Sequence, residues 1–464
     1  MATGTQRFKQ GVCVLLPALL FSCQARFEGL EVGPLEAVET VIEVTWRAED
    51  EDEAAWVEYS TAGGPVLLAP EIDGDVGEHR VLVIGHPEAT VVDLQPVVER
   101  GGQRVEGERL AVETGSLPPG LSDYEVSVSA AGQSEATHWM GMLLQSSEFG
   151  YDGTPIIIDR AGRIVWYHTL NEGSSALQLE RQLGTNDVLI NLLNLKPENG
   201  EEPTALLRIA MDGERVSARS AERSHHAFAQ PEPDVVAYLA YDERIVDEYD
   251  VTVIGDLLVE KDASGEETVL FSTWDALELS PEAVADSDEG RLDWTHANGL
   301  FYWAEHDSYL MSLHNLNLVL EISRATGEIM ATIGEGGDFT FPDGPEAIFY
   351  QQHHPTVTAD GTLMLFDNHT LGGQGMSRAV EYVLDDAQKT ATLVWEDPLD
   401  NDYTVGGLGQ SHRLSNGNTL INWGVLGELS EVTAEGELVW QVNTPLGETF
   451  GSGLLIDDLY AGLR

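Results

Sequence analysis

The feature of this 464-residue sequence that most constrains its fold is a loose internal repeat that begins near residue 153. Each unit contains a strand, a turn rich in Asp, Asn or Gly, and a second strand that often ends in an aromatic residue. The units cover residues 153–168, 188–216, 235–274, 309–333, 361–395 and 417–442. A glycine turn followed by Glu or Arg recurs at Gly162, Gly213, Gly265, Gly327 and Gly436. The insertions between units are too irregular for a solenoid, so we predict an all-β chain with a six-bladed β-propeller, closed by a strand near 139–144 or 451–459.

A second pattern precedes the repeat. Short alternating strands are predicted at 41–46, 55–60, 79–84 and 89–97, and their turns are rich in Gly and Asp. This arrangement resembles a fibronectin type III or immunoglobulin-like β-sandwich. His79 and His86 lie in it as isolated residues and are expected to be exposed. We therefore expect a small sandwich domain at 23–118, a linker at 119–136 and the propeller at 137–464.

The N-terminal segment 1–22 is predicted to be a lipoprotein signal peptide. Arg7 and Lys9 precede an apolar segment that is too short to span a bilayer permanently. The sequence Leu-Phe-Ser-Cys that ends at Cys23 resembles the bacterial lipobox, so Cys23 is expected to be lipidated and to begin the mature chain. The expected location is the bacterial outer membrane, with secretion to the periplasm or cell surface as the alternative. No cysteine follows Cys23, so the mature chain has neither a disulfide nor a Cys-based metal site.

The charge of the chain excludes one class of partner. It has 24 Lys and Arg residues against 79 Asp and Glu residues, a formal net charge of −55. Phosphate binding needs clustered basic side chains, so nucleic acid is not an expected partner. A hydrophobic content of 42% is still sufficient for packed cores, so the acidity indicates a solvated surface rather than disorder.

Histidines are the candidate functional residues. They occur in the repeat region as the groups His225-His226, His296 with Asn298, His314 with Asn315, and His353-His354, followed by His369 and His412. The inner strands of a propeller begin at one mouth of the channel, so these groups are expected to converge there. Each group also has an ordinary explanation. The first pair could be exposed at a strand end, and the Asn before Gly299 could form a turn.

The order of the motifs resembles the bacterial arylsulfate sulfotransferase family over residues 137–464. The motifs are SHHAFAQPEPDVVAYLAYDER (224–244), DWTHANGL (293–300), SLHNLNLVLEIS (312–323), TGEIMATIG (326–334), YQQHHPTVTADGTLMLFDN (350–368), SRAVEYVLD (377–385) and SHRLSNGNTLINWG (411–424). The resemblance implies a propeller behind an N-terminal sandwich. It also implies transfer of a sulfuryl group from a phenolic sulfate to a phenol, with no nucleotide sulfate donor, cofactor or metal.

The resemblance also implies roles for the central residues. His353 matches the family nucleophile, which forms a sulfohistidine intermediate, and His354 is the alternative. His296 and Asn298 match the pair that would donate hydrogen bonds to the sulfuryl oxygens.

Further roles follow from the same resemblance. His225 or His226 matches an early family histidine and would protonate the departing phenolate. His314 stands where the family has an Arg that holds the sulfuryl oxygens. Arg378 is another guanidinium that could serve there, and Trp294 could form a wall of the acceptor pocket, although core packing is an equally good explanation.

Two other functions are left open at this stage. A non-catalytic propeller could bind a ligand or a surface partner, and the missing Arg favours this alternative. A metal-dependent hydrolase could use the histidines, but no H-E-x-x-H motif supports it. For the sulfotransferase, the expected partners are a phenolic sulfate donor, a phenol acceptor, a membrane reached through lipidated Cys23, and a second copy of the chain in a homodimer.

Overall fold

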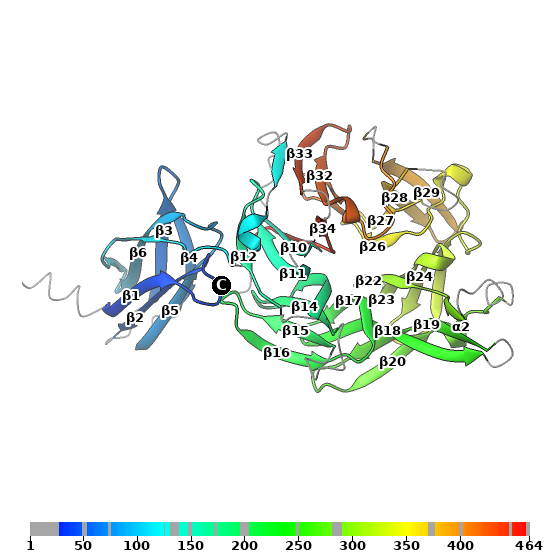
Figure 1. The fold of residues 1–464 in the computed structure, drawn as a ribbon, viewed down its shortest axis with the longest axis horizontal. Coiled ribbons are helices and arrows are strands. Elements are labelled where there is room, and N and C mark those ends of the chain that lie inside the picture. The colour runs from blue at the N-terminus through cyan, green and yellow to red at the C-terminus, as the bar shows by residue number, and fades with distance from the viewer. Residues whose placement is uncertain are drawn as a thin grey trace, which may run out of the picture. The chain divides into compact units, whose positions relative to one another are not determined.

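The structure of the chain is a computed structural model. It describes residues 27–48, 53–72, 76–124, 126–129, 139–146, 151–170, 174–194, 204–246, 250–280, 290–369, 376–397, 399, 402–444 and 448–460. The predicted signal peptide, Cys23 and part of the predicted linker lie outside these residues. The chain divides into two compact units that meet in the sequence between Gly115 and Ser116. Regular structure is almost entirely strand (Figure 1), and no helix among the described residues is long and apolar enough to cross a membrane.

The first unit contains two antiparallel sheets in its described part. The first sheet consists of β1 (Glu28–Pro34), β2 (Ile42–Ala48) and β5 (Gly77–Val83). The second consists of β3 (Ala54–Thr61), β4 (Leu67–Ile72), β6 (Val91–Arg100), β7 (Gln103–Glu106) and β8 (Leu110–Glu113). The four strands expected from the sequence correspond to β2, β3, β5 and β6, each within a few residues.

The core of the first unit is built from alternate residues of these strands. In β2, Val44 and Trp46 are buried while Thr45 between them is more exposed, as the period of two requires. The expectation that His79 and His86 are exposed is wrong. The ring of His79 stacks on Trp46 with centroids 5.1 Å apart, and His86 packs edge-on against Tyr59 at 5.4 Å. Their apolar ring faces contribute to the core.

The second unit contains six sheets of four or five strands within its described residues (Figure 1). The first sheet comprises β10 (Trp139–Ser146), β11 (Tyr151–Ile158), β12 (Ile164–Tyr167), β34 (Glu448–Phe450) and β35 (Leu454–Ile456). The second comprises β13 (Ser174–Arg181), β14 (Val188–Asn194), β15 (Ala205–Ile209) and β16 (Arg215–Ser220). The third comprises β17 (Ser224–Glu232), β18 (Val235–Val246), β19 (Val251–Lys261), β20 (Glu267–Ser272) and β21 (Arg291–Asp293).

The remaining three sheets follow the same order along the chain. The fourth comprises β22 (Ala297–Trp303), β23 (Ser308–Leu313), β24 (Leu318–Ser323) and β25 (Ile329–Gly334). The fifth comprises β26 (His353–Val357), β27 (Leu363–Asp367), β28 (Arg378–Asp385) and β29 (Thr390–Glu396). The sixth comprises β30 (Gln410–Arg413), β31 (Thr419–Asn422), β32 (Glu428–Val432), β33 (Leu438–Asn443) and β9 (Ser127–Ser129). A four-residue helix, α2 (Thr273–Ala276), follows β20.

The recurring glycine turn occupies the same hairpin in five of the sheets. It joins β11 to β12, β15 to β16, β19 to β20, β24 to β25 and β32 to β33. All five glycines have positive φ, from 70° to 94°, a conformation that costs glycine little. Each donates its amide to a carbonyl three or four residues earlier, which closes the turn. The repeat in the sequence thus marks one structural position.

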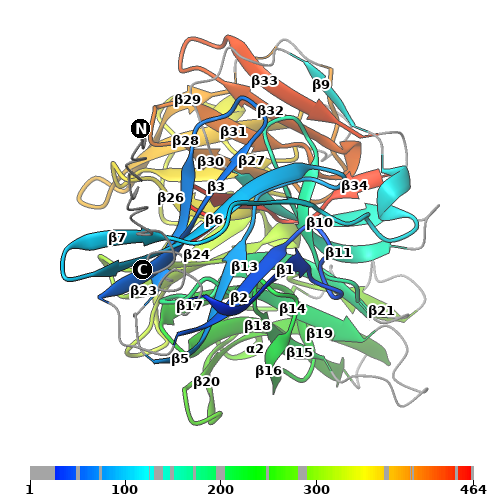
Figure 2. The same cartoon turned by 90° about the vertical axis from the view of Figure 1, so that its left-hand side faces the viewer.

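The two ends of the second unit pair with each other's sheets. Near the C-terminus β34 and β35 pair with β10, and β9 pairs along the edge strand β33 (Figure 2). The segments 139–144 and 451–459 were each expected to close the fold. They contain β10 and β35, which pair in one sheet. β9 falls within the segment expected to be a linker. The first strands of successive sheets contact one another, and apolar side chains fill the space between neighbouring sheets. This arrangement is consistent with a propeller-like fold.

Candidate active site

Four histidines from the third, fourth and fifth sheets form a continuous row of rings. The ring centroids of His226 and His296 are 4.8 Å apart, those of His296 and His314 are 5.0 Å apart, and those of His314 and His353 are 5.4 Å apart. The structure thus brings together the histidine groups that the sequence places more than a hundred residues apart. Convergence was expected from the inner strands of a propeller.

His226 and His353 belong to β17 and β26, His296 immediately precedes β22 and His314 follows β23. The backbone is irregular where β17, β22 and β26 begin. The pairing register shifts after His225 in β17, after Ala297 in β22 and after His353 in β26, which marks a β-bulge in each first strand. His226 and His296 have φ of 47°, and His354 has φ of 50°, in the left-handed region that non-glycine residues seldom adopt. Such conformations cost of order 1–3 kcal/mol each and concentrate at functional sites.

A glycine lets two of these strands approach closely. A Cβ on Gly299 would lie 2.6 Å from Cδ of Pro355 and 3.0 Å from the amide nitrogen of His354, so only glycine fits. The preceding Asn298 lies in β22 and donates from Nδ2 to the carbonyl of Gln352 at 2.9 Å. Asn298 therefore bridges the fourth and fifth sheets and does not form the turn that was its alternative explanation. Its buried Oδ1 has no hydrogen-bond partner among the described residues.

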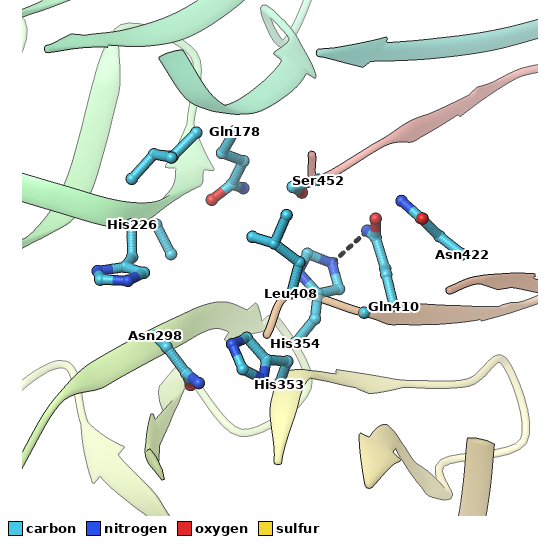
Figure 3. Close-up of a pocket in the computed structure, with 12 residues that line it drawn as sticks. Gln178, His226, Asn298, His353, His354, Leu408, Gln410, Asn422 and Ser452 are labelled. Carbon is cyan, nitrogen blue, oxygen red and sulfur yellow. Dashed lines mark hydrogen bonds between the residues drawn. The ribbon is translucent and has the colours of Figure 1, made fainter. Parts of the chain in front are cut away.

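The side chains of Gln178, His226, Asn298 and His353 surround a small cavity (Figure 3). Its volume is about 30 Å³, above the ~10–15 Å³ that one water requires. The other residues that line it in the described part of the chain are Leu177, Ala227, His354, Leu408, Gly409, Gln410, Asn422 and Ser452. These lining residues include no lysine, arginine or carboxylate, so the cavity is polar but uncharged unless a histidine is protonated.

The hydrogen bonds of His353 define which ring nitrogen carries its proton. Nδ1 lies 2.7 Å from Oδ1 of Asn368. The amide of Asn368 is fixed because its Nδ2 donates to the carbonyls of Val405 and Leu408 at 2.9 and 3.0 Å. Oδ1 can only accept, so Nδ1 of His353 carries the proton of the neutral ring and the lone pair lies on Nε2.

The protonation state of His353 also suits a nucleophile. Burial, together with the neighbouring His314, lowers the pKa of His353 to about 3, and the Asn368 hydrogen bond opposes this only in part. The ring is therefore neutral at physiological pH. A neutral imidazole with a fixed proton and an available Nε2 lone pair is the form that attacks an electrophile.

His354 is held differently. Its Nε2 lies 2.6 Å from Nε2 of Gln410 (Figure 3). The Gln410 amide is fixed by Gly453, whose carbonyl accepts from Nε2 at 2.9 Å and whose amide donates to Oε1 at 2.7 Å. Gln410 must therefore donate to His354, and the Nε2 lone pair of His354 is occupied. The geometry favours His353 over His354 as the nucleophile.

His296 is the one histidine of the row that is paired with a carboxylate. Its Nδ1 lies 2.5 Å from Oδ2 of Asp293. The hydrogen bond to Asp293 raises the pKa of His296 above its usual value, although burial opposes this. His314 is the next ring of the row after His296, and its Nδ1 lies 2.7 Å from the side-chain oxygen of Asn315. Burial lowers the pKa of His314, so the pKa values of these two adjacent rings are shifted in opposite directions.

His225 lies behind His226 and is almost fully buried. Its Nε2 is 3.0 Å from Oδ1 of Asp256 in β19. The other oxygen of Asp256 accepts hydrogen bonds from the Thr295 hydroxyl at 2.5 Å and from the Ala297 amide at 2.8 Å. Burial alone would raise the pKa of Asp256, but His225 and these hydrogen bonds hold it below its usual value. The alternative of an exposed rim pair therefore does not apply to His225.

Two residues expected to bind substrate lie elsewhere. Arg378 donates to Asp367 at 3.0 Å, to Glu396 at 2.8 Å and to the Glu346 carbonyl at 2.8 Å, so its donors fix the fifth sheet. Trp294 is buried against Trp274, with ring centroids 5.2 Å apart, in an apolar cluster beside β19. These contacts match the alternatives of blade support for Arg378 and core packing for Trp294, and the substrate roles of the two residues stay predictions. The described residues contain no group of three or more His, Cys, Asp and Glu side chains arranged to hold a metal ion.

The sequence motifs did not assign roles to the polar residues that orient the histidines. Asn368 ends the FDN element of the motif at 350–368, and Gln410 immediately precedes the motif at 411–424. Both residues could therefore have been identified as candidates from the sequence. Asp256 could also have been identified as a candidate, because it is the one acidic residue in the apolar segment VTVIGDLLV (251–259). Asp293 begins the motif that contains His296, three residues away.

Comparison with known proteins supports the resemblance drawn from the motifs. The sequence model of the arylsulfotransferase (ASST) family matches residues 127–445. No curated protein matches the chain significantly. Among solved structures, a protein of unknown function from Bacteroides caccae is 15% identical, with 70% of this chain and 100% of that chain covered and a TM-score of 0.41. A streptogramin B lyase is 9% identical, with coverages of 87% and 98% and a TM-score of 0.33. These structural similarities are too low to support a functional argument. The family match covers well over half of the sequence, and the chain belongs to the arylsulfotransferase family.

Proposed function

We propose that the protein is an arylsulfate sulfotransferase that moves a sulfuryl group from a phenolic sulfate to a phenol through a sulfohistidine on His353. The observation that carries this proposal is the fixed tautomer of His353, whose Nδ1–H is bound to Asn368 and whose Nε2 lone pair is available in a ring that lines the cavity. The family membership supplies the reaction class. No nucleotide sulfate donor, metal or other cofactor is required in this scheme.

The transfer takes place in two displacements. In the first, Nε2 of His353 forms a bond to sulfur while the bond from sulfur to the phenolic oxygen breaks, and the departing phenolate takes a proton from the His225-His226 pair. In the second, the oxygen of the acceptor phenol forms a bond to sulfur and gives its proton back to that pair, while the N–S bond breaks and its electron pair returns to Nε2. The kinetics are therefore ping-pong.

Charge on the transferred oxygens must be stabilised without the arginine of the family. The residue at that position is His314, which lies in the row of rings but is neutral. We infer that protonated His296 replaces the arginine, because Asp293 stabilises its positive charge. Asn298 keeps one N–H of Nδ2 for the sulfuryl oxygens, since its hydrogen bond to Gln352 uses only the other.

The architecture and location complete the proposal. We interpret the six sheets of the second unit as blades of a propeller and the two sheets of the first unit as a β-sandwich. We further propose that the chain is exported and anchored to the membrane through lipidated Cys23. The small-molecule partners are a phenolic sulfate and a phenol.

The experiment that tests the proposal uses 4-nitrophenyl sulfate as donor and phenol as acceptor. We expect continuous release of nitrophenol only when phenol is present, and a stoichiometric burst without it. His353→Ala is expected to abolish both the burst and the acid-labile sulfuryl label, whereas His354→Ala keeps the label. Continuous release without acceptor would indicate a hydrolase, and no burst in the folded wild-type protein would refute the proposal.

A further inference from the structure

We propose that Asp256, His225 and His226 form a proton relay in which His226 exchanges a proton with the phenolic oxygen and His225 carries the resulting positive charge. This inference rests on the proposed sulfuryl transfer. It gives the two adjacent histidines separate roles, His226 as the catalytic acid and base and His225 as a positioning residue that acts through it.

The relay is a chain of three side chains that ends at the cavity. Oδ1 of Asp256 lies 3.0 Å from Nε2 of His225, and Nδ1 of His225 lies 2.9 Å from Nδ1 of His226. His226 lines the cavity that it shares with His353, whereas His225 does not. Because Nδ1 of His226 faces His225, the remaining nitrogen, Nε2, is the one available to a phenol in the cavity.

The bulge in β17 makes this contact between sequence neighbours possible. Adjacent side chains of a regular strand point to opposite faces of the sheet. The left-handed backbone of His226 and the register shift after His225 bring the two rings together, with centroids 5.1 Å apart and planes nearly perpendicular. The ring of Tyr241 stacks on His225 at 3.9 Å and fixes its plane.

The hydrogen bond between the two histidines reverses during the cycle. In the proposed starting state His225 is paired as a cation with the Asp256 carboxylate 3.0 Å away, and its Nδ1–H donates to Nδ1 of His226. When the donor S–O bond breaks, Nε2–H of His226 gives its proton to the phenolate oxygen. The proton on Nδ1 of His225 then moves to Nδ1 of His226, and His225 becomes neutral. In the second displacement Nε2 of His226 takes the proton of the acceptor phenol, and the same shift runs backwards.

The charges balance at each stage. A monoanionic donor and a cationic relay give a neutral phenol and a sulfuryl-His353 whose imidazolium and sulfonate charges cancel. Whenever the relay carries a positive charge, that charge therefore resides on His225, beside the Asp256 carboxylate. Burial lowers the pKa of His226 well below its usual value, as do, to a smaller extent, the facing rings of His225, His296, His353 and His314. A cation on His226 is thus disfavoured, and transfer onward to His225 avoids it.

The test measures how the rate depends on the acidity of the leaving phenol. Phenyl sulfate releases a phenol whose pKa is near ~10, like that of tyrosine, and needs a proton donor, whereas the nitrophenolate of 4-nitrophenyl sulfate leaves readily without one. We expect His225→Phe, which preserves the stacking on Tyr241, to lower kcat/KM about 10²-fold for phenyl sulfate. With 4-nitrophenyl sulfate, kcat/KM of the same variant should remain nearly unchanged.

Controls separate this relay from a structural role. His306→Gln breaks a similar histidine–carboxylate contact, in which Nδ1 of His306 lies 2.8 Å from Glu321. His306 does not line the cavity, so this variant should leave kcat/KM unchanged with both donors. If His225→Phe does not fold, Asp256→Asn removes the carboxylate charge while keeping the shape of the side chain. The same loss of kcat/KM is then expected for phenyl sulfate but not for 4-nitrophenyl sulfate. An equal loss with both donors, or no loss with either, in a folded variant would show that the relay is wrong. Absence of the wild-type burst with 4-nitrophenyl sulfate would instead refute the proposed function.

Discussion

The amide of Asn368 offers the most direct test of why His353 is reactive. Asn368→Leu keeps the approximate volume of the side chain but removes the oxygen that accepts the Nδ1 proton of His353 at 2.7 Å. A buried N–H without a partner costs about 1–3 kcal/mol, so the tautomer with the proton on Nε2 becomes favoured by a comparable amount. That tautomer has no lone pair on the attacking nitrogen. The productive fraction, and with it the rate of sulfohistidine formation, should fall about 5- to 150-fold.

The assay is the rate of the nitrophenol burst without acceptor, because the burst reports the first displacement alone. The variant also loses hydrogen bonds to the carbonyls of Val405 and Leu408, so we expect the free energy of unfolding to fall by about 2–3 kcal/mol. Gln410→Leu is the matched control: it removes similar bonds beside His354 and should destabilise the fold comparably while the label still forms on His353. A folded Asn368→Leu protein with a wild-type burst rate would refute the tautomer argument.

Three further predictions concern charge and location. His314→Arg should raise the transfer rate, by up to about 10²-fold, because a permanent guanidinium replaces a neutral imidazole; an unchanged rate would show that the oxygens are held by other groups. Asp293→Asn should move the alkaline limb of the pH–rate profile to lower pH, since the raised pKa of His296 keeps it charged below that pKa and the charge is lost as pH rises through it; a limb that stays in place would contradict this role of His296. In cells, Cys23→Ala should move the protein from the membrane fraction to a soluble one or leave full-length precursor, and unchanged membrane fractionation would contradict the anchor.

The periodic parts of the fold could be predicted because the sequence repeats them. The positive φ at Gly162 and Gly213 follows from a turn that only certain residues tolerate, so spacing alone located these hairpins. Burial of His79 could not be predicted in this way. It depends on Trp46 in the neighbouring strand, to which no local pattern connects it. The hydrogen bonds of Arg378 could not be predicted for the same reason, since its three acceptors come from separate segments.

The convergence of the histidines could be predicted from the topology of a propeller, but the different environments of the individual rings could not. Asn298 and His353 were singled out as residues, yet their orientation depends on bulges and left-handed backbone that alternation in the sequence does not reveal. The adjacent pair His225-His226 looks symmetrical in the sequence. Only the structure shows that one ring faces Asp256 and the other lines the cavity.

In the proposed mechanism, histidines have different functions because their hydrogen-bond partners differ. His353 is bound to the neutral amide of Asn368, which fixes the proton without stabilising a positive charge, so the ring remains a nucleophile. His296 is bound to the carboxylate of Asp293, which stabilises the imidazolium that a sulfuryl group requires nearby. We therefore expect a carboxylate in place of Asn368, or an amide in place of Asp293, to remove the proposed function of the ring beside it: a charged His353 could not attack sulfur, and a neutral His296 could not stabilise its oxygens.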